Sequence, residues 1–441
     1  LHRLIRRQRQ MCIRDRKKRA QVVKNEEDTK QSKSSIKELL KSKDGLTIYP
    51  SFNKMNLNKE LLKGIYSIGY EKPSLVQSKA IVPIISGKDI IIQQQSGTGK
   101  TATFTIAMLQ VLYGLSTANT KKKTDGLQAL VISPTRELAI QINGVIENLG
   151  TYLKVDSFCL TGLANNTAND KVNNDKKIKL DLKKLGNADI VSGTPGKIVD
   201  CLKRNQISLD NLKMIILDEA DELLDEHLGF KKQIYEIFSK INLKTQVVIL
   251  SATMSSNILE VSKKIMNWDN HIKILTKKKE ISLDVIKQYK VELKENWKFN
   301  TLLDILNTVS YQQAVIFVNN VKKCDSLSKF LNKQKFSIVS IHSKLSQLER
   351  LEQMNKFRNG TYKILVTTDI WARGIDVQQI NLVINYDLPT IIENYIHRIG
   401  RSGRFGRLGK AINFVTDEDE KQLSKIEKYY KIEIPDMPND I

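Results

Sequence analysis

A short apolar run, a glycine-rich turn and a helix-like stretch follow one another between residues 90 and 109, and few folds accommodate that order. The run Ile90 to Ile92 predicts a buried strand, and Ala102 to Leu109 has helical periodicity. Backbone N–H groups of the turn, the Lys100 ammonium and the Thr101 hydroxyl are the groups that hold phosphates and Mg²⁺. Because Gln94 stands where the general phosphate-loop pattern has a glycine, a chance strand–turn–helix is the alternative. The residues assigned to phosphate are Ser96, Gly97, Thr98, Gly99, Lys100 and Thr101.

Further short β-branched runs alternate with helical stretches along the rest of the chain, which is typical of a parallel sheet with crossover helices. A length of 441 residues fits two such domains. We therefore predict an α/β protein with a basic disordered tail over 1–46, a first domain over 47–273, a linker over 274–285 and a second domain over 286–441. The runs lie at 130–132, 190–191, 214–217, 247–250, 314–318, 338–341, 364–367, 382–385 and 411–415.

Charge and cysteine usage narrow the class of protein. The 71 Lys and Arg outnumber the 48 Asp and Glu, for a formal charge of +23, which favours polyanions such as nucleic acid or an acidic membrane surface; a solvated basic face is the alternative. The 4 cysteines form no CxxC pair, so we expect neither a disulfide framework nor a zinc site. This cysteine usage indicates a reducing intracellular setting. No apolar run approaches the ~18 residues of a membrane helix.

A second nucleotide element follows the apolar run 214–217. Asp218 and Glu219 come directly after this predicted strand, at the end where α/β sheets bind ligands. Asp218 would hold Mg²⁺, and Glu219 would orient the water that attacks the γ-phosphate. An acidic helix N-terminus that complements the helix dipole is the alternative. In company with the phosphate loop, these carboxylates indicate hydrolysis of a nucleoside triphosphate.

The sequence Asp-Glu-Ala-Asp at 218–221 resembles the name-giving motif of the DEAD-box RNA helicases. Other motifs of that family occur in order at 134–139, 194–197, 251–253, 372–376 and 397–404, and the resemblance runs from about Phe52 to the C-terminus. The resemblance implies two RecA-like domains that close around ATP and clamp RNA, with ATP and Mg²⁺ as cofactors. It also implies RNA-stimulated hydrolysis of ATP and local unwinding of RNA.

Roles at the nucleotide follow from this resemblance residue by residue. Gln77 would read the adenine edge, with an exposed turn near Pro73 as the alternative, and Phe52 would stack on the base. Asp376 would contact the ribose. Arg401 and Arg404 would act as arginine fingers beside the catalytic Lys100, Asp218 and Glu219. Residues expected to couple hydrolysis to RNA binding are Asp221, Ser251, Thr253 and His397.

The resemblance places RNA contacts in both domains, and backbone amides, hydroxyls and arginines favour binding that does not depend on base sequence. The segment 346–357 reads as a helix, so Gln347 and Arg350 would face one strand. Arg373 belongs to the same set. The residues are Pro134, Thr135, Arg136, Gly162, Thr194, Pro195, Gly196, Asn319, Gln347, Arg350, Thr368, Asp369 and Arg373.

The chain departs from the family pattern at Gln94, Leu163 and Lys197, where Ala, Gly and Arg are usual. A side chain at Leu163 and the lost guanidinium fork at Lys197 predict weaker RNA binding than is usual in the family. The Asn- and Lys-rich segment 165–184 reads as a divergent loop.

Within the family, segments such as 51–57, 95–104, 374–379 and 433–438 resemble eukaryotic translation initiation factor 4A. That resemblance implies a cytoplasmic role on messenger RNA leaders, with a scaffold like factor 4G and a stimulator like factor 4B as partners. It also implies that the protein does not act at a membrane and is a monomer outside complexes. Arg401-Ser-Gly-Arg404 resembles a nuclear relative that clamps spliced messenger RNA more than it resembles the initiation factor, which usually has Gly-Gly there. A DNA translocase and an inactive scaffold are further alternatives. The Arg-rich opening reads as a mis-called start or a targeting segment.

Overall fold

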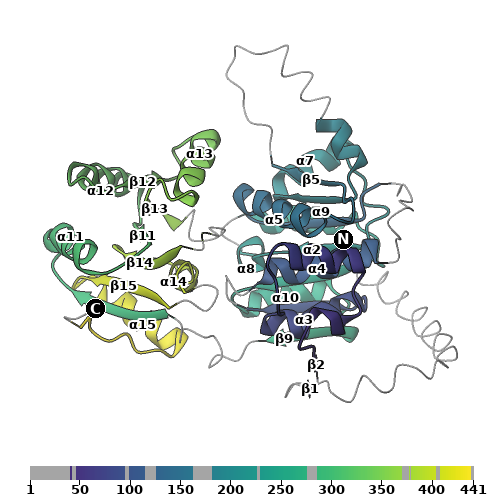
Figure 1. Ribbon diagram of the computed structural model, residues 1–441, viewed down its shortest axis with the longest axis horizontal. Helices are drawn as coiled ribbons and strands as arrows, with labels where there is room; N and C mark the ends of the chain where they lie inside the picture. Colours follow the sequence, from purple (N-terminus) through teal and green to yellow (C-terminus); the bar gives the residue numbers. More distant parts are fainter. Residues whose placement is uncertain are drawn as a thin grey trace, which may run out of the picture. The chain divides into compact units, whose positions relative to one another are not determined.

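The computed structural model describes residues 40–41, 46–94, 99–114, 126–161, 181–225, 229–275, 286–369, 377, 379–403 and 408–438. The chain forms two compact units, the first ending at Leu275 and the second described from Ile286 (Figure 1). Within these ranges, no helix is both long and apolar enough to cross a membrane.

The first unit is built on a seven-stranded sheet whose strands all run parallel, in the order β5-β6-β4-β7-β8-β3-β9. The interior strands are buried on both faces, as expected where helices cover both sides of a parallel sheet. The strands are β3 (Asp89–Gln93), β4 (Ala129–Ile132), β5 (Ser157–Leu160), β6 (Ile190–Gly193), β7 (Met214–Leu217), β8 (Gln246–Ser251) and β9 (His271–Leu275).

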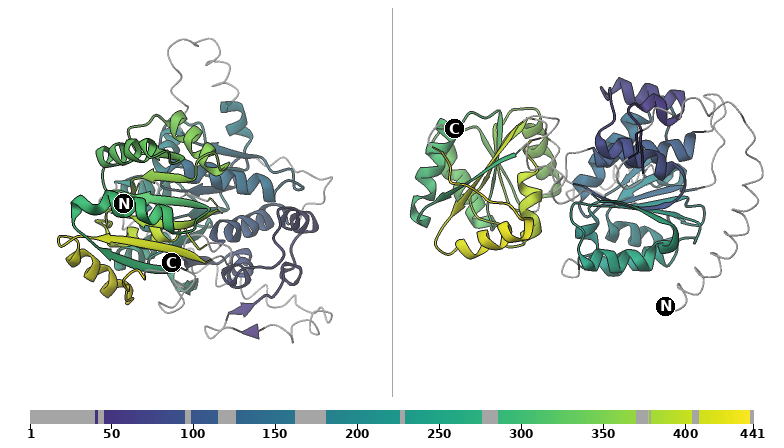
Figure 2. Two further views of the ribbon diagram at one scale, coloured as in Figure 1. Left: turned by 60° about the vertical axis from the view of Figure 1, so that its left-hand side comes forward. Right: turned by 90° about the horizontal axis from the view of Figure 1, so that it is seen from below.

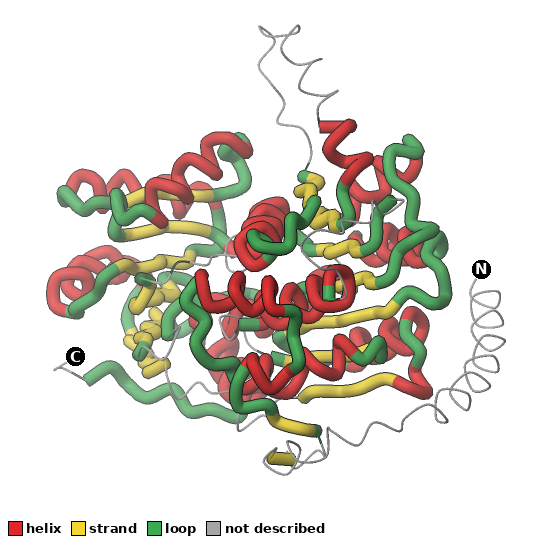
Figure 3. The backbone as a smooth tube through the Cα atoms, turned by 45° about the vertical axis from the view of Figure 1, so that its right-hand side comes forward, coloured by secondary structure: helices red, strands yellow, loops and turns green. Residues whose placement is uncertain are grey.

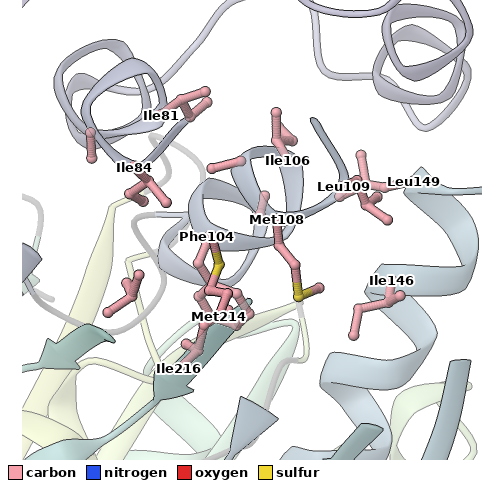
Figure 4. Packing of buried hydrophobic residues seen from close by; sticks show 14 of the residues in the cluster. Ile81, Ile84, Phe104, Ile106, Met108, Leu109, Ile146, Leu149, Met214 and Ile216 are labelled. Carbon is pink, nitrogen blue, oxygen red and sulfur yellow. The ribbon is translucent and has the colours of Figure 1, made fainter. Parts of the chain in front are cut away.

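Helices lie on both faces of this sheet, and alternate residues of one strand enter different cores. Figure 4 shows Phe104 and Met108 in the core on one face. Ile90 and Ile92 join that core, whereas Ile91 joins the core on the other face. The helices are η2 (Phe52–Met55), α2 (Lys59–Ser67), α3 (Leu75–Ile85), α4 (Lys100–Tyr113), α5 (Arg136–Leu149), α7 (Pro195–Lys203), α8 (Ala220–Leu223), α9 (Phe230–Phe238), α10 (Ser256–Ile265) and η3 (Trp268–Asn270).

A two-stranded antiparallel ladder precedes η2. It pairs β1 (Leu40–Lys41) with β2 (Thr47–Ile48). Strand β1 falls inside the segment 1–46 that was predicted as a basic tail. Apart from Leu40, Lys41 and Leu46, that segment lies outside the described residues.

The second unit repeats the architecture with a six-stranded parallel sheet in the order β10-β15-β14-β11-β13-β12 (Figures 2 and 3). Its strands are β10 (Ile286–Glu292), β11 (Gln313–Phe317), β12 (Ile338–Ile341), β13 (Ile364–Thr367), β14 (Ile380–Asn385) and β15 (Gly409–Val415). Its helices are η5 (Glu295–Trp297), α11 (Lys298–Thr308), α12 (Val321–Lys333), α13 (Gln347–Arg358), α14 (Ile392–Ile399) and α15 (Glu420–Tyr430). The predicted fold class, two tandem parallel-sheet domains flanked by helices, is confirmed.

Strand β10 lies at one end of this sheet, and a segment near the C-terminus covers its outer side. The Lys290 N–H donates to the Pro435 carbonyl oxygen at 2.9 Å, and the Met437 N–H donates to the Lys290 carbonyl oxygen at 2.9 Å. Lys290 and Asp436 thereby form a parallel bridge that satisfies backbone groups on the outer side of β10.

Candidate nucleotide and RNA sites

The carboxyl ends of β3, β7 and β8 bring the nucleotide motifs of the first unit together. The Gln94 N–H, directly after β3, donates to the Ser251 carbonyl oxygen at the end of β8 (2.9 Å). The Asp218 N–H, directly after β7, donates to the Ile132 carbonyl oxygen at the end of β4 (3.0 Å). The phosphate loop, the carboxylate pair and the segment that starts at Ser251 therefore share one edge of the sheet, where parallel sheets bind ligands.

Lys100 is the first residue of α4, and its ammonium is buried. Gly99 precedes it with a φ of 91°, a backbone conformation that glycine adopts without strain. Lys100 is 7% exposed, and its Nζ has no hydrogen-bond partner among the described residues. Burial of an ammonium without a hydrogen-bond partner costs free energy, so this position favours the binding of an anion.

Asp218 and Glu219 are buried beside this cation. The Asp218 Oδ1 accepts the Glu219 N–H at 3.0 Å. Burial raises the pKa of the Asp218 carboxyl, and the charge of Lys100 opposes that shift. Glu219 has a φ of 52°, which is uncommon for a residue with a side chain, and its buried Oε2 has no hydrogen-bond partner among the described residues. Strain and unsatisfied polar atoms of this kind gather at functional sites.

These side chains fit a nucleoside triphosphate with Mg²⁺. The described residues contain no group of three His, Cys, Asp or Glu side chains that could hold a metal alone. Mg²⁺ in nucleotide sites is held by one or two protein oxygens together with phosphates and water. Asp218 and the Thr101 hydroxyl would be those oxygens here, and Lys100 would be the matching cation for phosphate.

Gln77 is 5% exposed, so the alternative reading of this region as an exposed turn is wrong for its side chain. The Gln77 Oε1 accepts the Ser74 N–H at 2.8 Å as part of the capping box of α3. Its Nε2 donates to the Gly99 carbonyl oxygen at 3.4 Å. Gln77 thus contacts the last glycine of the phosphate loop, and its contact with adenine stays a prediction.

Phe52 does not present a ring face for a base in this structure. It is 0% exposed and belongs to the core of the first unit, where its ring meets Tyr66 edge to face at 6.5 Å. The prediction that Phe52 stacks on adenine is therefore corrected: the apolar ring gains more from the core beneath η2 than from solvent.

Three of the predicted coupling residues of the first unit touch one another. The Thr253 hydroxyl donates to Asp221 Oδ2 at 3.3 Å. The Ser251 hydroxyl donates to the Thr253 carbonyl oxygen at 2.5 Å, and the Thr253 N–H donates to Ser251 Oγ at 3.3 Å. These bonds join the helix after the carboxylate pair to the segment after β8.

The described RNA residues predicted in the first unit lie at the N-termini of two neighbouring helices, α5 and α7. Thr135 caps α5 by accepting the Leu138 N–H at 3.3 Å, and Arg136 is exposed directly after it, whereas Pro134 is buried. Thr194, Pro195 and Gly196 open α7. Because β4 pairs with β6, these two helix N-termini are adjacent, and their N–H groups suit phosphates.

At Lys197, a departure from the family pattern, the Nζ donates to Asp200 Oδ2 at 2.7 Å. The same Asp200 pairs with Arg204. The ammonium of Lys197 therefore pairs with a carboxylate of its own helix, α7, which is consistent with the predicted weaker RNA binding.

In the second unit, Asn319 and Asp369 are joined by Arg398, a residue to which the sequence assigned no role. Arg398 is 0% exposed; its Nε donates to Asp369 Oδ1 at 2.5 Å and its Nη2 to Asn319 Oδ1 at 2.9 Å. Its Nη1 donates to the Asp387 carbonyl oxygen at 2.7 Å. Its place in the motif 397–404 was the only signal that could have found it.

The remaining predicted residues of the second unit are placed as follows. Arg401 is 2% exposed, with its Nε donating to the His397 carbonyl oxygen at 3.0 Å, and His397 is buried in α14. Thr368 follows β13, and Arg350 lies on α13, which confirms the predicted helix. Outside the described residues lie Ser96, Gly97, Thr98, Gly162, Leu163, Arg373, Asp376, Arg404, the linker over 276–285, loop residues 165–180 and the side chain of Gln347.

A phosphate loop and two carboxylates at the carboxyl edge of a parallel sheet, followed by a second unit of the same architecture, define a nucleoside triphosphatase with tandem RecA-like domains. Residues 74–261 match the DEAD/DEAH box helicase family, and residues 297–406 match the helicase conserved C-terminal domain. The chain belongs to the DEAD-box ATP-dependent RNA helicases.

Relatives of known name agree with this assignment. The chain is 52% identical to the ATP-dependent RNA helicase FAL1 of Vanderwaltozyma polyspora, over 91% of this chain and 96% of the relative. It is also 52% identical to FAL1 of Saccharomyces cerevisiae, over 90% and 95%. The structure of S. cerevisiae Dbp5 bound to RNA and ADP BeF3 matches with a TM-score of 0.76 and 34% identity, over 89% of this chain and 96% of that one. The enzyme is thus an RNA-stimulated ATPase, with ATP and RNA as its ligands.

Proposed function

We propose that the protein clamps single-stranded RNA without regard to base sequence and unwinds short duplexes locally when ATP with Mg²⁺ binds. The observation that carries this proposal is the buried, unpaired ammonium of Lys100 next to the buried Asp218. An anion with an attached divalent cation would satisfy both groups at once. Mg²⁺ would supply charge neutralisation at the β- and γ-phosphates.

The protein groups then act on the reaction as follows. Lys100 would bind the phosphates, Asp218 would hold the cation, and Glu219 would orient the attacking water. Guanidinium groups of the second unit, Arg401 and Arg404, would complete the site when ATP brings the two units together. RNA contacts in both units would then form a single path, so ATP binding and RNA binding would reinforce each other.

The test is steady-state ATP hydrolysis with single-stranded RNA, with single-stranded DNA of the same sequence, and without nucleic acid. We expect strong stimulation by RNA alone, and loss of hydrolysis on omission of Mg²⁺. Equal stimulation by DNA would point to a translocase, and hydrolysis that RNA leaves unchanged would contradict the clamp.

For the cellular role, we propose action on messenger RNA leaders in translation initiation, in the cytoplasm and with partners like factors 4G and 4B. The support is the resemblance of 51–57, 95–104, 374–379 and 433–438 to initiation factor 4A. The printed name of the yeast relatives, ATP-dependent RNA helicase FAL1, does not itself state a role in translation initiation. Cross-linking of the protein to cellular RNA tests it: cross-links concentrated on messenger leaders, with a 4G-like scaffold co-purified, are expected. Enrichment on spliced junctions or on non-coding RNA would contradict it.

A further inference from the structure

The amino ends of the strands in the first unit carry a row of exposed lysines that the nucleotide and RNA motifs do not use. Lys213 directly precedes β7, Lys244 lies two residues before β8, and Lys88 directly precedes β3. All three side chains are exposed. The phosphate loop follows β3 at the opposite edge of the same sheet, so this row is a separate surface of the first unit.

Hydrogen bonds of Gln246 join the segments that carry these lysines. The Gln246 N–H donates to the Lys213 carbonyl oxygen at 2.8 Å, and the Gln246 side-chain Nε2 donates to the Lys88 carbonyl oxygen at 2.6 Å. Asp89, after Lys88, accepts the Asn267 N–H at 2.6 Å through Oδ2, which fixes the start of η3 against β3. The row therefore continues from β7 through β8 and β3 to β9.

The row ends in an aromatic and basic cluster. The rings of Trp268 and His271 stack at 4.1 Å between centroids, with 25° between their planes. The Lys273 ammonium lies 4.3 Å from the centroid of the Trp268 ring, and that of Lys263 lies 5.5 Å from it. Trp268 is partly exposed, and both lysines are exposed. Asp269 is the exposed carboxylate beside this cluster.

We propose that this surface, formed by Lys88, Lys213, Lys244, Lys263, Lys273, Trp268 and His271 and named here the lysine edge, is a second contact for single-stranded RNA. Adjacent strands are about 4.8 Å apart, so the lysines form a line that a linear polyanion can follow. Lysine ammoniums bind phosphates regardless of base sequence, and the stacked pair Trp268–His271, both partly exposed, adds aromatic surface for a base at the end of the row. RNA held here would stay attached while the helicase site releases its strand.

RNA oligonucleotides of two lengths distinguish binding at the lysine edge from binding at the helicase site. One of about 8 nucleotides falls within the span of a single binding module and can occupy the helicase site alone, whereas one of about 30 can reach both surfaces. The test variant combines Lys213→Glu with Lys244→Glu in the full chain. The control combines Lys421→Glu with Lys425→Glu on α15, which changes the net charge equally on exposed lysines of the second unit.

Fluorescence anisotropy with labelled RNA and a non-hydrolysable ATP analogue gives the readout. For the test variant we expect an unchanged Kd for the short RNA and about a tenfold weaker Kd for the long RNA. Loss of two phosphate contacts should also lower the slope of log K against log salt by about 1.4 for the long RNA. Trp268→Ala should weaken only long-RNA binding, and Trp268→Phe should restore it because the stacking ring remains.

Three outcomes would overturn the proposal. One is an unchanged Kd of the test variant for the long RNA. Another is a loss of affinity that is equal for the short and long RNAs, or equal in the test and control variants. The third is unchanged RNA binding with lost binding of poly-glutamate, which would assign the lysine edge to an acidic protein. Failure of the short RNA to bind any variant, the unaltered chain included, would instead count against the helicase assignment.

Discussion

The buried Arg398 and the partly exposed Asp369 form an ion pair in the second unit, with 2.5 Å between Arg398 Nε and Asp369 Oδ1. The same guanidinium donates to Asn319, so a single side chain holds two predicted RNA residues in fixed positions. The positions of these two residues depend on a planar, forked donor, because the two contacts leave the guanidinium in different directions.

Arg398→Lys should therefore lower RNA affinity and RNA-stimulated hydrolysis together, since lysine has the charge but lacks the fork. Loss of the hydrogen bonds made by this guanidinium should also lower the free energy of unfolding by about 1–3 kcal/mol. RNA binding by anisotropy and a denaturant titration check both effects. The control is Arg204→Lys, whose partner Asp200 is shared with Lys197 and whose side chain is 65% exposed. Unchanged RNA affinity in Arg398→Lys would show that Asn319 and Asp369 need no such support.

Glu219→Gln should leave ATP binding intact and lower hydrolysis by about 10²- to 10⁴-fold, because the amide cannot accept a proton from the attacking water. RNA should dissociate more slowly from the ATP-bound variant than from the unaltered protein. Single-turnover hydrolysis and RNA dissociation rates measure these effects. Glu222→Gln, on the same short helix α8, is the matched control, and normal hydrolysis in Glu219→Gln would exclude Glu219 as the residue that activates water.

Thr253→Val should uncouple hydrolysis from unwinding, because it removes the hydroxyl that donates to Asp221. ATP hydrolysis is expected to persist while strand separation of a short duplex falls. Thr245→Val removes a comparable bond, from the Thr245 hydroxyl to the Leu212 carbonyl oxygen at 2.8 Å, at the opposite end of β8. Each variant should lose about 1 kcal/mol of stability. Equal unwinding by the two variants would remove Thr253 from the coupling set.

Asp218→Asn should stabilise the nucleotide-free protein while abolishing hydrolysis. Since burial raises the pKa of Asp218, the folded protein keeps this proton at pH values where the unfolded chain has released it. The free energy of unfolding therefore falls as pH rises from the ordinary carboxyl pKa to the raised one, and stays lower above it. An amide removes that penalty, so Tm near neutral pH should rise by roughly 2–4 °C for each kcal/mol gained.

Thermal melts at several pH values test the last prediction, with Asp304→Asn at an exposed position of α11 as the control. A lower Tm for Asp218→Asn at neutral pH would mean that the carboxylate is stabilised by its surroundings, contrary to the direction of its pKa shift.

The sequence predicted the interior strands well and the outer strands poorly. The runs 214–217 and 364–367 coincide with the interior strands β7 and β13, because strands covered on both faces are continuously apolar. The run 338–341 coincides with β12, which is an exception because it lies at the end of its sheet. β5, β9 and β10 lie at sheet ends, and no predicted run matches them. In β9 and β10, polar residues such as Lys273 and Lys287 stand between the apolar ones, so no apolar run marks these two strands.

The nucleotide motifs were found because each is contiguous in sequence. The hydrogen bonds of Arg398 in the second unit were not predicted, because Arg398 meets Asn319, Asp369 and Asp387 only after folding. Burial of Phe52 was likewise invisible, since an aromatic residue that stacks on a base and one that fills a core look alike in a sequence.

The bridge between Lys290 and Asp436 has a consequence for how the protein behaves in concentrated solution. The segment around Asp436 covers the outer side of β10, where unpaired backbone groups would otherwise recruit another chain. Removal of residues from Ile434 onward should expose that strand while leaving the nucleotide groups of the first unit untouched. The shortened enzyme should keep its ATP affinity yet self-associate as its concentration rises, so the last residues of the second unit protect solubility.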